Sequence, residues 1–190
     1  MKSLVFLSLL LAVLSTAPPD DRLITRNGSI SFYSKAPLEN IEANTKTAVS
    51  VLDKKTGQLE FSVLIKSFTF EKALMQEHFN ENYLESDRFP KSTFKGKIED
   101  LSKVNFDKDG KYTVVVTGEL FIHGETKSLV TPATITIHSG TATATTEFNI
   151  SLSDYKIKIP SLVKDKISNS VKIVVNLEYG NQAEQLQIKN

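Results

Sequence analysis

Residues 112–122 read YTVVVTGELFI, and apolar side chains recur at every second position of this stretch apart from Gly118. The residues that share the apolar parity are Val114, Val116, Leu120 and Ile122. Successive side chains of a strand point to opposite faces, so this spacing predicts a half-buried antiparallel strand with one apolar face. The alternation continues with few breaks to residue 152 and resumes over residues 171–179. The chain is therefore predicted to be all-β and mainly antiparallel.

Other segments fit the same scheme and add one helix. Residues 71–83 change period, because Met75, Phe79 and Tyr83 recur at the spacing of a single helix stripe. An up-and-down barrel with a helix inserted after an early strand would leave no exposed sheet edge, whereas a β-sandwich is the alternative. The remaining strands are predicted at residues 28–35, 41–52, 58–66, 94–99, 131–138, 141–152 and 171–179.

Composition excludes several classes of site and partner. The chain of 190 residues has the length of one domain, and it contains no cysteine, so a thiolate zinc site and a disulfide framework are excluded. The chain has 23 basic and 22 acidic side chains. Removal of Lys2 with the signal peptide would leave 22 of each, because 23 minus 1 is 22. A neutral chain argues against nucleic acid or an anionic membrane surface as the main partner.

The first seventeen residues have the features of a secretory signal peptide. Lys2 supplies a positive start, residues 4–14 are apolar apart from Ser8, and residues 15–17 are small enough for cleavage. The apolar run is too short to span a bilayer, so we expect a periplasmic or secreted protein with no integral membrane span after cleavage. The expected organisation is a signal peptide over residues 1–17, a β-barrel domain over 18–180 and a polar tail over 181–190.

The sequence contains few residues suited to catalysis or metal binding. Its histidines, His78, His123 and His138, do not follow a metal-binding spacing, and no G-x-S-x-G motif is present. His123 and His138 are predicted to be solvated, whereas His78 on the helix could bond either a ligand head group or a backbone carbonyl. Glu77, Glu81 and Glu85 are interpreted as a solvated helix face. The expectation is therefore a protein that is not an enzyme and holds no metal or cofactor.

The interior could be filled or hollow. Gly96, Gly118, Ala133 and Ala144 lie among large residues of the inward parity. Small residues at such positions either leave a cavity or fit the taper of a packed core. By itself, this pattern is more typical of a packed core.

Three stretches of the chain resemble the YceI-like family of exported, lipocalin-like proteins. Residues 118–127, GELFIHGETK, resemble the family hairpin G-x-L-T-[IL]-x-G-x-T-[KR]. Residues 75–96 resemble its helix-to-strand passage, in which a histidine precedes an aromatic and proline element. Residues 154–173 resemble its final pair of elements, so the resemblance covers residues 28–180 in order.

The resemblance implies an extended eight-stranded barrel that encloses a long isoprenoid chain, of the prenyl quinone or prenyl phosphate type, in an apolar lumen. Met75 and Gln76 stand where the family often has Arg then Asp, which favours an uncharged head group or a different tail. The residues expected to contact the ligand are Phe32, Phe61, Val63, Leu74, Met75, His78, Phe79, Phe94, Ile98, Val114, Val116, Leu120, Ile135, Ile137, Phe148, Ile150, Ile173 and Val175.

The leading hypothesis is therefore an exported carrier or reservoir for an isoprenoid lipid. One alternative is a stress-related interaction or structural module with a filled core. Another is an enzyme that acts on the prenyl head group, for which His78 is the single candidate. The resemblance leaves open whether the protein forms a homodimer.

Overall fold

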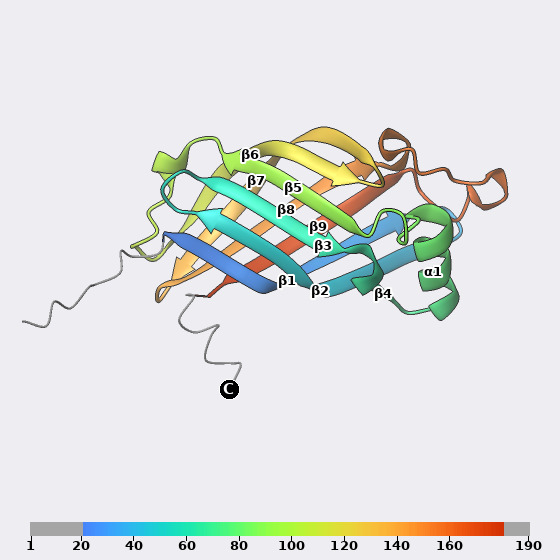
Figure 1. Cartoon of the computed structure of the whole chain (residues 1–190), viewed down its shortest axis with the longest axis horizontal. Helices are drawn as coiled ribbons and strands as arrows, with labels where there is room; N and C mark the ends of the chain where they lie inside the picture. Colours follow the sequence, from blue (N-terminus) through green and yellow to red (C-terminus); the bar gives the residue numbers. More distant parts are fainter. Residues whose placement is uncertain (1–20, 181–190) are drawn as a thin grey trace, which may run out of the picture.

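The computed structural model describes residues 21–180, so the predicted signal peptide (1–17) and polar tail (181–190) lie outside the described residues. The molecule is an elongated barrel with α1 (Ala73–His78) packed at one end (Figure 1). Its strands are β1 (Arg22–Lys35), β2 (Asn40–Asp53), β3 (Gln58–Leu64), β4 (Thr69–Phe70), β5 (Lys91–Ile98), β6 (Gly110–Ile122), β7 (Glu125–His138), β8 (Thr141–Ser151) and β9 (Ser170–Tyr179).

The sheet closes on itself. Within residues 21–180 the strand order is β1-β9-β8-β7-β6-β5-β3-β2, and β2 pairs again with β1, so eight antiparallel strands form a ring. The two-residue strand β4 is added to the end of β2. Pairing of β1 with both β2 and β9 distinguishes a barrel from a β-sandwich. The predicted barrel class is therefore confirmed, and the β-sandwich alternative is wrong.

Strand register aligns the inward side chains into rows. Phe61 of β3 lies opposite Phe94 of β5, and Phe94 lies opposite Leu120 of β6. A second row crosses β1, β9 and β8, where Ile173 lies between Phe32 and Phe148. Because side chains alternate in every strand, such rows give the barrel an apolar interior and a polar outer face.

The largest differences between predicted and observed strand starts are in β1 and β7, which begin at Arg22 and Glu125 and not at residues 28 and 131. β1 starts at Arg22, because register shifts between Thr25 and Ile30 interrupt the alternation that would have revealed its first half. β7 starts at Glu125, since its polar first residues pair with β6 across the tight turn at His123 and Gly124. Polar hairpin residues carry no apolar alternation, so the pattern placed this start too late.

The helix is shorter and less regular than predicted. α1 ends at His78 and continues as a π-helix over Phe79–Tyr83. A π-helical turn widens the backbone spiral and rotates the side chains that follow it. In the preceding segment, β3 ends at Leu64, and the 3-10 helix Ile65–Ser67 leads to β4.

Candidate functional site

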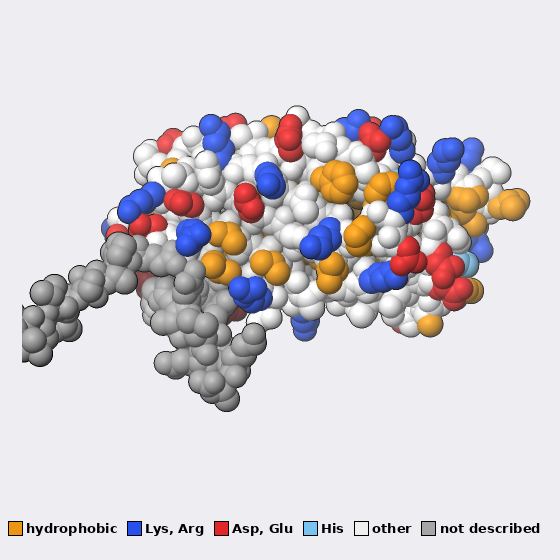
Figure 2. All heavy atoms as spheres, in the orientation of Figure 1, with side chains coloured by type: hydrophobic (Ala, Val, Ile, Leu, Met, Phe, Trp, Pro, Cys, Tyr) orange, Lys and Arg blue, Asp and Glu red, His pale blue; other side chains and the backbone are white. Residues whose placement is uncertain are grey.

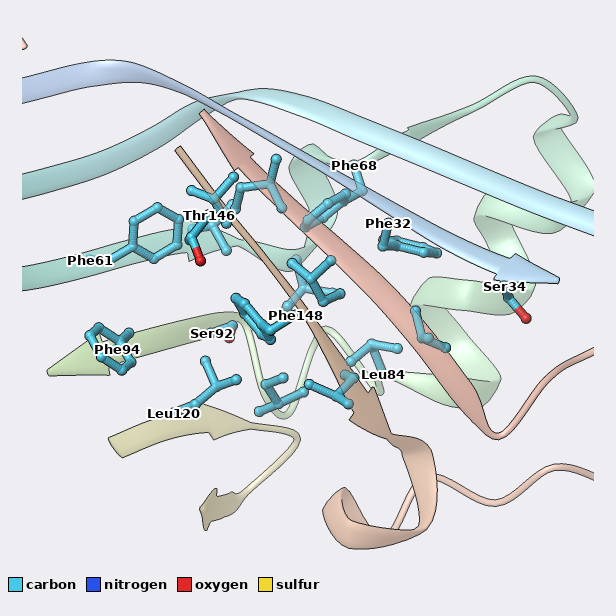
Figure 3. Close-up of a pocket in the computed structure, with 18 of the residues that line it drawn as sticks. Phe32, Ser34, Phe61, Phe68, Leu84, Ser92, Phe94, Leu120, Thr146 and Phe148 are labelled. Carbon is cyan, nitrogen blue, oxygen red and sulfur yellow. The ribbon is translucent and has the colours of Figure 1, made fainter. Parts of the chain in front are cut away.

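An apolar cavity of about 560 Å³ lies inside the barrel. This volume falls within the range of roughly 300–1,000 Å³ that is typical of small-molecule sites. Phe32, Phe61, Phe94, Leu120 and Phe148, which belong to different strands, point toward one common interior (Figure 3). The interior of the barrel is therefore hollow, which does not fit the alternative of a filled core.

Most of the predicted lumen residues lie on the wall of this cavity. They are Phe32, Phe61, Val63, Leu74, Met75, His78, Phe79, Phe94, Ile98, Val116, Leu120, Ile135, Phe148, Ile150, Ile173 and Val175. Val114 and Ile137 do not line it, although each is 3% exposed. Both have the inward parity, but they pack in the core toward the end of the barrel away from α1. They therefore lie outside the wall of this cavity, and their contact with a ligand stays a prediction.

Four phenylalanine rings form a cluster where α1 meets the barrel. Phe32 of β1 packs against Phe68, Phe70 and Phe79, with ring centroids 5.4 to 5.7 Å apart. Phe79 also contacts Phe68 and Phe70 at 5.8 and 5.0 Å. Aromatic pairs at these separations stabilise the contact beyond the apolar area that they bury. The cluster therefore fixes the helix over the cavity.

The polar residues at the mouth were not foreseen. Ser34, Glu39, Lys72 and Lys166 line the cavity near α1. Lys72 Nζ lies 2.9 Å from Glu39 Oε1, and this contact raises the pKa of Lys72 above its ordinary value. Ser34 lies near the end of β1 and the other three residues come from separate connections, so no local sequence pattern groups them. His78 also lines the cavity, and its side chain is exposed.

Gln76 attaches α1 to the barrel. Its Oε1 accepts a hydrogen bond of 3.3 Å from the backbone N–H of Phe70. The neighbouring Met75 lines the cavity. Gln76 therefore positions the helix, whereas Met75 adds an adaptable apolar surface to the mouth of the cavity.

Deeper polar groups on the wall are satisfied by protein partners. Thr131 and Thr146 hydroxyls are 3.0 Å apart, and Thr146 donates to the Pro132 carbonyl at 2.8 Å. Ser92 donates to the Phe121 carbonyl at 2.7 Å. A polar atom that already has its partner makes little demand on a ligand. The deep part of the cavity therefore suits a hydrocarbon chain without hydrogen-bonding groups.

Gly96 and Gly118 do not enlarge the cavity. They lie opposite each other on β5 and β6, and the Phe94 ring covers both. A Cβ atom at Gly96 or Gly118 would lie 2.6 or 2.7 Å from Phe94 Cζ. The absence of side chains at Gly96 and Gly118 therefore leaves room for the Phe94 ring. The sequence allowed these small residues either to leave a cavity or to fit a packed core, and at this pair they fit a packed core.

Within residues 21–180, no three His, Cys, Asp or Glu side chains lie together in a way that could hold a metal ion. None of the helices in that range combines the length and apolar character needed to cross a membrane.

A model of the YceI-like domain family matches residues 24–179. The chain belongs to the YceI-like family. The predicted resemblance is thus confirmed over nearly the whole described structure. No curated protein matches the chain.

Solved structures share the YceI-like fold at low sequence identity. A polyisoprenoid-binding domain from Saccharophagus degradans, implicated in plant cell wall breakdown, has a TM-score of 0.75 at 13% identity and covers 85% of this chain and 98% of its own. Burkholderia cenocepacia BcnA has a TM-score of 0.66 at 18% identity, with 80% and 95% covered. A Campylobacter jejuni YCEI protein has a TM-score of 0.58 at 20% identity, with 74% and 85% covered.

The YceI-like hairpin buries a histidine that was predicted to be solvated. The His123 side chain is 9% exposed, because its ring packs edge-on against Phe89 with centroids 4.8 Å apart. Its ring nitrogens contact the Tyr155 carbonyl at 2.9 Å and Glu85 Oε1 at 3.2 Å. Glu85 lies beyond the helix and therefore does not belong to a solvated helix face. His138, by contrast, is 83% exposed, as predicted.

Proposed function

We propose that this YceI-like protein binds one long isoprenoid lipid non-covalently in the barrel cavity and acts as an exported carrier or reservoir. The observation that carries the proposal is the apolar cavity of about 560 Å³, lined mainly by aliphatic and aromatic side chains. Removing an apolar tail from water gains roughly 25 cal/mol per Å² of buried area, so such a wall is sufficient for affinity.

The ligand is proposed to lie with its tail deep in the barrel and its head group at the mouth. His78 and Lys166 offer polar groups at the α1 end. At the other end, Leu101, Val104 and Phe106 from the β5–β6 connection pack against the core. A polar head group would therefore lose less hydration at the mouth than at that end. Both a prenyl quinone and a prenyl phosphate are compatible with this orientation.

Binding of this kind needs no catalytic step and no cofactor. The absence of enzymatic activity and export by the signal peptide stay predictions, and homodimer formation stays an open alternative. The polyisoprenoid-binding domain from Saccharophagus degradans supports the lipid class by similarity of fold.

Mass spectrometry of an organic extract tests the proposal. The protein would be purified from its native compartment, extracted with organic solvent and compared with a sample denatured before purification. A stoichiometric prenyl lipid in the native sample alone is the expected result. An empty extract, followed by no uptake of either a long-chain prenyl quinone or a long-chain prenyl phosphate from detergent, would contradict the proposal.

A further inference from the structure

Three separate segments form the mouth of the cavity. They are the β1–β2 turn, the α1 region and the β8–β9 connection (residues 152–169), which contribute Glu39, Lys72 and Lys166 respectively to the cavity wall. The Leu38 N–H donates a hydrogen bond of 2.9 Å to the Asp165 carbonyl. This bond joins the first segment to the third. The three segments together are called the rim of the cavity.

Each segment of the rim exposes a leucine. Leu38 is 71% exposed, Leu74 is 61% exposed, and Leu162, in the 3-10 helix Ser161–Val163, is 94% exposed. Single exposed leucines are normal on protein surfaces, but these three surround the opening of an apolar cavity. Because Leu162 is almost fully exposed, its side chain contributes almost no burial energy to the stability of the free protein. Its neighbour Val163 lines the cavity, so the exposed tip is continuous with the interior.

The charge of the rim is uneven, although the chain as a whole is close to neutral. The β8–β9 connection carries Lys156, Lys158, Lys164 and Lys166 against Asp154 and Asp165. Lys156 is paired with Glu125 at 2.6 Å, which leaves the other lysines around Leu162. On the α1 side, Lys72 is paired with Glu39, and Glu71, Glu77 and Glu81 add negative charge. At the α1 end of the molecule, lysine side chains lie beside exposed apolar ones (Figure 2).

We propose that the β8–β9 connection docks the cavity mouth on an anionic lipid bilayer, with Leu162 inserted among the acyl chains and Lys158, Lys164 and Lys166 facing the head groups. The inference rests on the proposed function, since it supplies the site at which the cavity exchanges its lipid. At an anionic bilayer, the burial of an inserted apolar side chain and the attraction of nearby lysines to the head groups both contribute to the binding free energy. Lysine stems also reach toward the interface while the ammonium groups stay hydrated.

The charge distribution fixes which side of the rim makes contact. Glu77 on α1 and Glu81 on the π-helix that follows it are repelled by anionic head groups, whereas the β8–β9 side is attracted to them. The bilayer therefore meets the mouth at Leu162, and the α1 side is held farther away. In this orientation a lipid tail enters beside Val163 and Ile167, both on the cavity wall, and crosses little water.

Vesicle co-sedimentation tests the docking surface directly. The probes are vesicles of phosphatidylcholine alone and of phosphatidylcholine mixed with phosphatidylglycerol, each at low and high salt. The full chain is expected to bind the mixed vesicles, more weakly as salt rises. Leu162→Ser should weaken binding by about tenfold, and each charge removed in Lys158→Gln/Lys164→Gln by about fivefold at low salt.

Matched controls remove comparable groups away from the mouth. Val130 on β7 is 65% exposed, so Val130→Ser deletes a similar apolar side chain. Lys111 lies near the start of β6, toward the other end of the barrel. Val130→Ser and Lys111→Gln should each bind vesicles within about twofold of the unaltered protein. Equal losses in Leu162→Ser and Val130→Ser would overturn the proposal.

Two further results separate docking from lipid binding. Uptake of a prenyl quinone from detergent should be unchanged in Leu162→Ser, because Leu162 does not line the cavity. Normal uptake with no vesicle binding by the unaltered protein would overturn docking and leave the proposed function standing. Leu162-dependent vesicle binding without uptake would support docking and reject the proposed function. Leu162-dependent self-association in light scattering, without vesicle binding, would assign the surface to a second copy of the chain.

Discussion

His123 Nε2 lies 3.2 Å from Glu85 Oε1, while His123 Nδ1 lies 2.9 Å from the Tyr155 carbonyl oxygen. A carbonyl oxygen only accepts, so His123 Nδ1 donates the hydrogen bond to Tyr155, while Nε2 faces the Glu85 carboxylate. Glu85 and His123 have φ values of 43° and 50°, in the left-handed region that non-glycine residues seldom adopt. The contacts therefore hold the loop between the π-helix and β5, the β6–β7 turn and the β8–β9 connection together at a strained junction.

The Glu85→Gln protein should lose less stability at acid pH than the unaltered protein. The hydrogen bond from His123 holds the pKa of Glu85 below its ordinary value of 4.5. A carboxylate with a lowered folded-state pKa stabilises the fold above the unfolded-state pKa, and this contribution is lost as pH falls through the folded-state pKa. Urea midpoints measured below pH 4.5 should therefore fall more steeply for the unaltered protein than for Glu85→Gln. Glu119→Gln, on the outer face of β6, serves as the control. An equally steep fall in Glu85→Gln would show that the His123 contact contributes nothing.

Val116→Trp should block lipid binding while the barrel still folds. Val116 lines the cavity, and an indole ring there would occupy space that the ligand needs, at a cost of roughly 1–3 kcal/mol in stability. Val115 is the next residue on β6 and is 41% exposed on the outer face, so Val115→Trp is a matched control. Lipid stoichiometry by mass spectrometry, together with circular dichroism, distinguishes the two. Normal loading of a folded Val116→Trp protein would place the ligand elsewhere. Leu120→Trp tests the same space from another level of β6.

Sequence alternation predicted the barrel well because it reports which face of the sheet a side chain occupies. It could not report how far along the barrel a residue lies. Val114 and Ile137 have the same parity as Val116 and Ile135, yet they pack beyond the cavity. Parity is a local property, whereas depth depends on the tilt and register of all the strands.

Residues outside the regular strands were the hardest to predict. Phe68 and Phe70 line the cavity after a 3-10 helix, where no alternation identifies an inward face. His123 was placed in solvent because turns are usually exposed, but contacts from two distant connections bury it. Glu39, Lys72 and Lys166 meet at the mouth only after the barrel closes. These features depend on tertiary contacts that a single sequence does not display.

Gly118→Ala should destabilise the barrel without entering the cavity. Its Cβ would lie 2.7 Å from Phe94 Cζ and 2.5 Å from the Gly96 Cα across the strand pair. The ring could shift, but the neighbouring backbone cannot, so a loss of roughly 1–3 kcal/mol is expected in urea unfolding. Gly110→Ala is a useful contrast, since its nearest neighbours belong to the Tyr112 side chain at 3.0 Å and beyond. Equal stability of the Gly118→Ala protein would mean that β5 and β6 separate readily.

Tyr179→Phe should remove an alkaline transition from the unfolding of the barrel. Ser50 donates its hydroxyl hydrogen to the Glu60 carbonyl at 3.0 Å, so the buried Tyr179 hydroxyl donates to Ser50 at 2.9 Å. Loss of this bond should cost about 1 kcal/mol at neutral pH. Burial raises the pKa of Tyr179 from 10.0 to about 12, so the folded state keeps a proton that the unfolded chain releases.

The stability that this proton supplies is fully present below pH 10.0 and is lost as pH rises toward about 12. Urea midpoints of the unaltered protein should therefore fall across this interval more than those of Tyr179→Phe. Burial also raises the pKa values of Tyr83 and Tyr155, but both proteins contain them, so the difference between the two curves isolates Tyr179. Tyr33→Phe, on the outer face of β1, should follow the unaltered protein. Parallel curves for Tyr179→Phe and the unaltered protein would mean that the hydroxyl is not held in a water-excluded site.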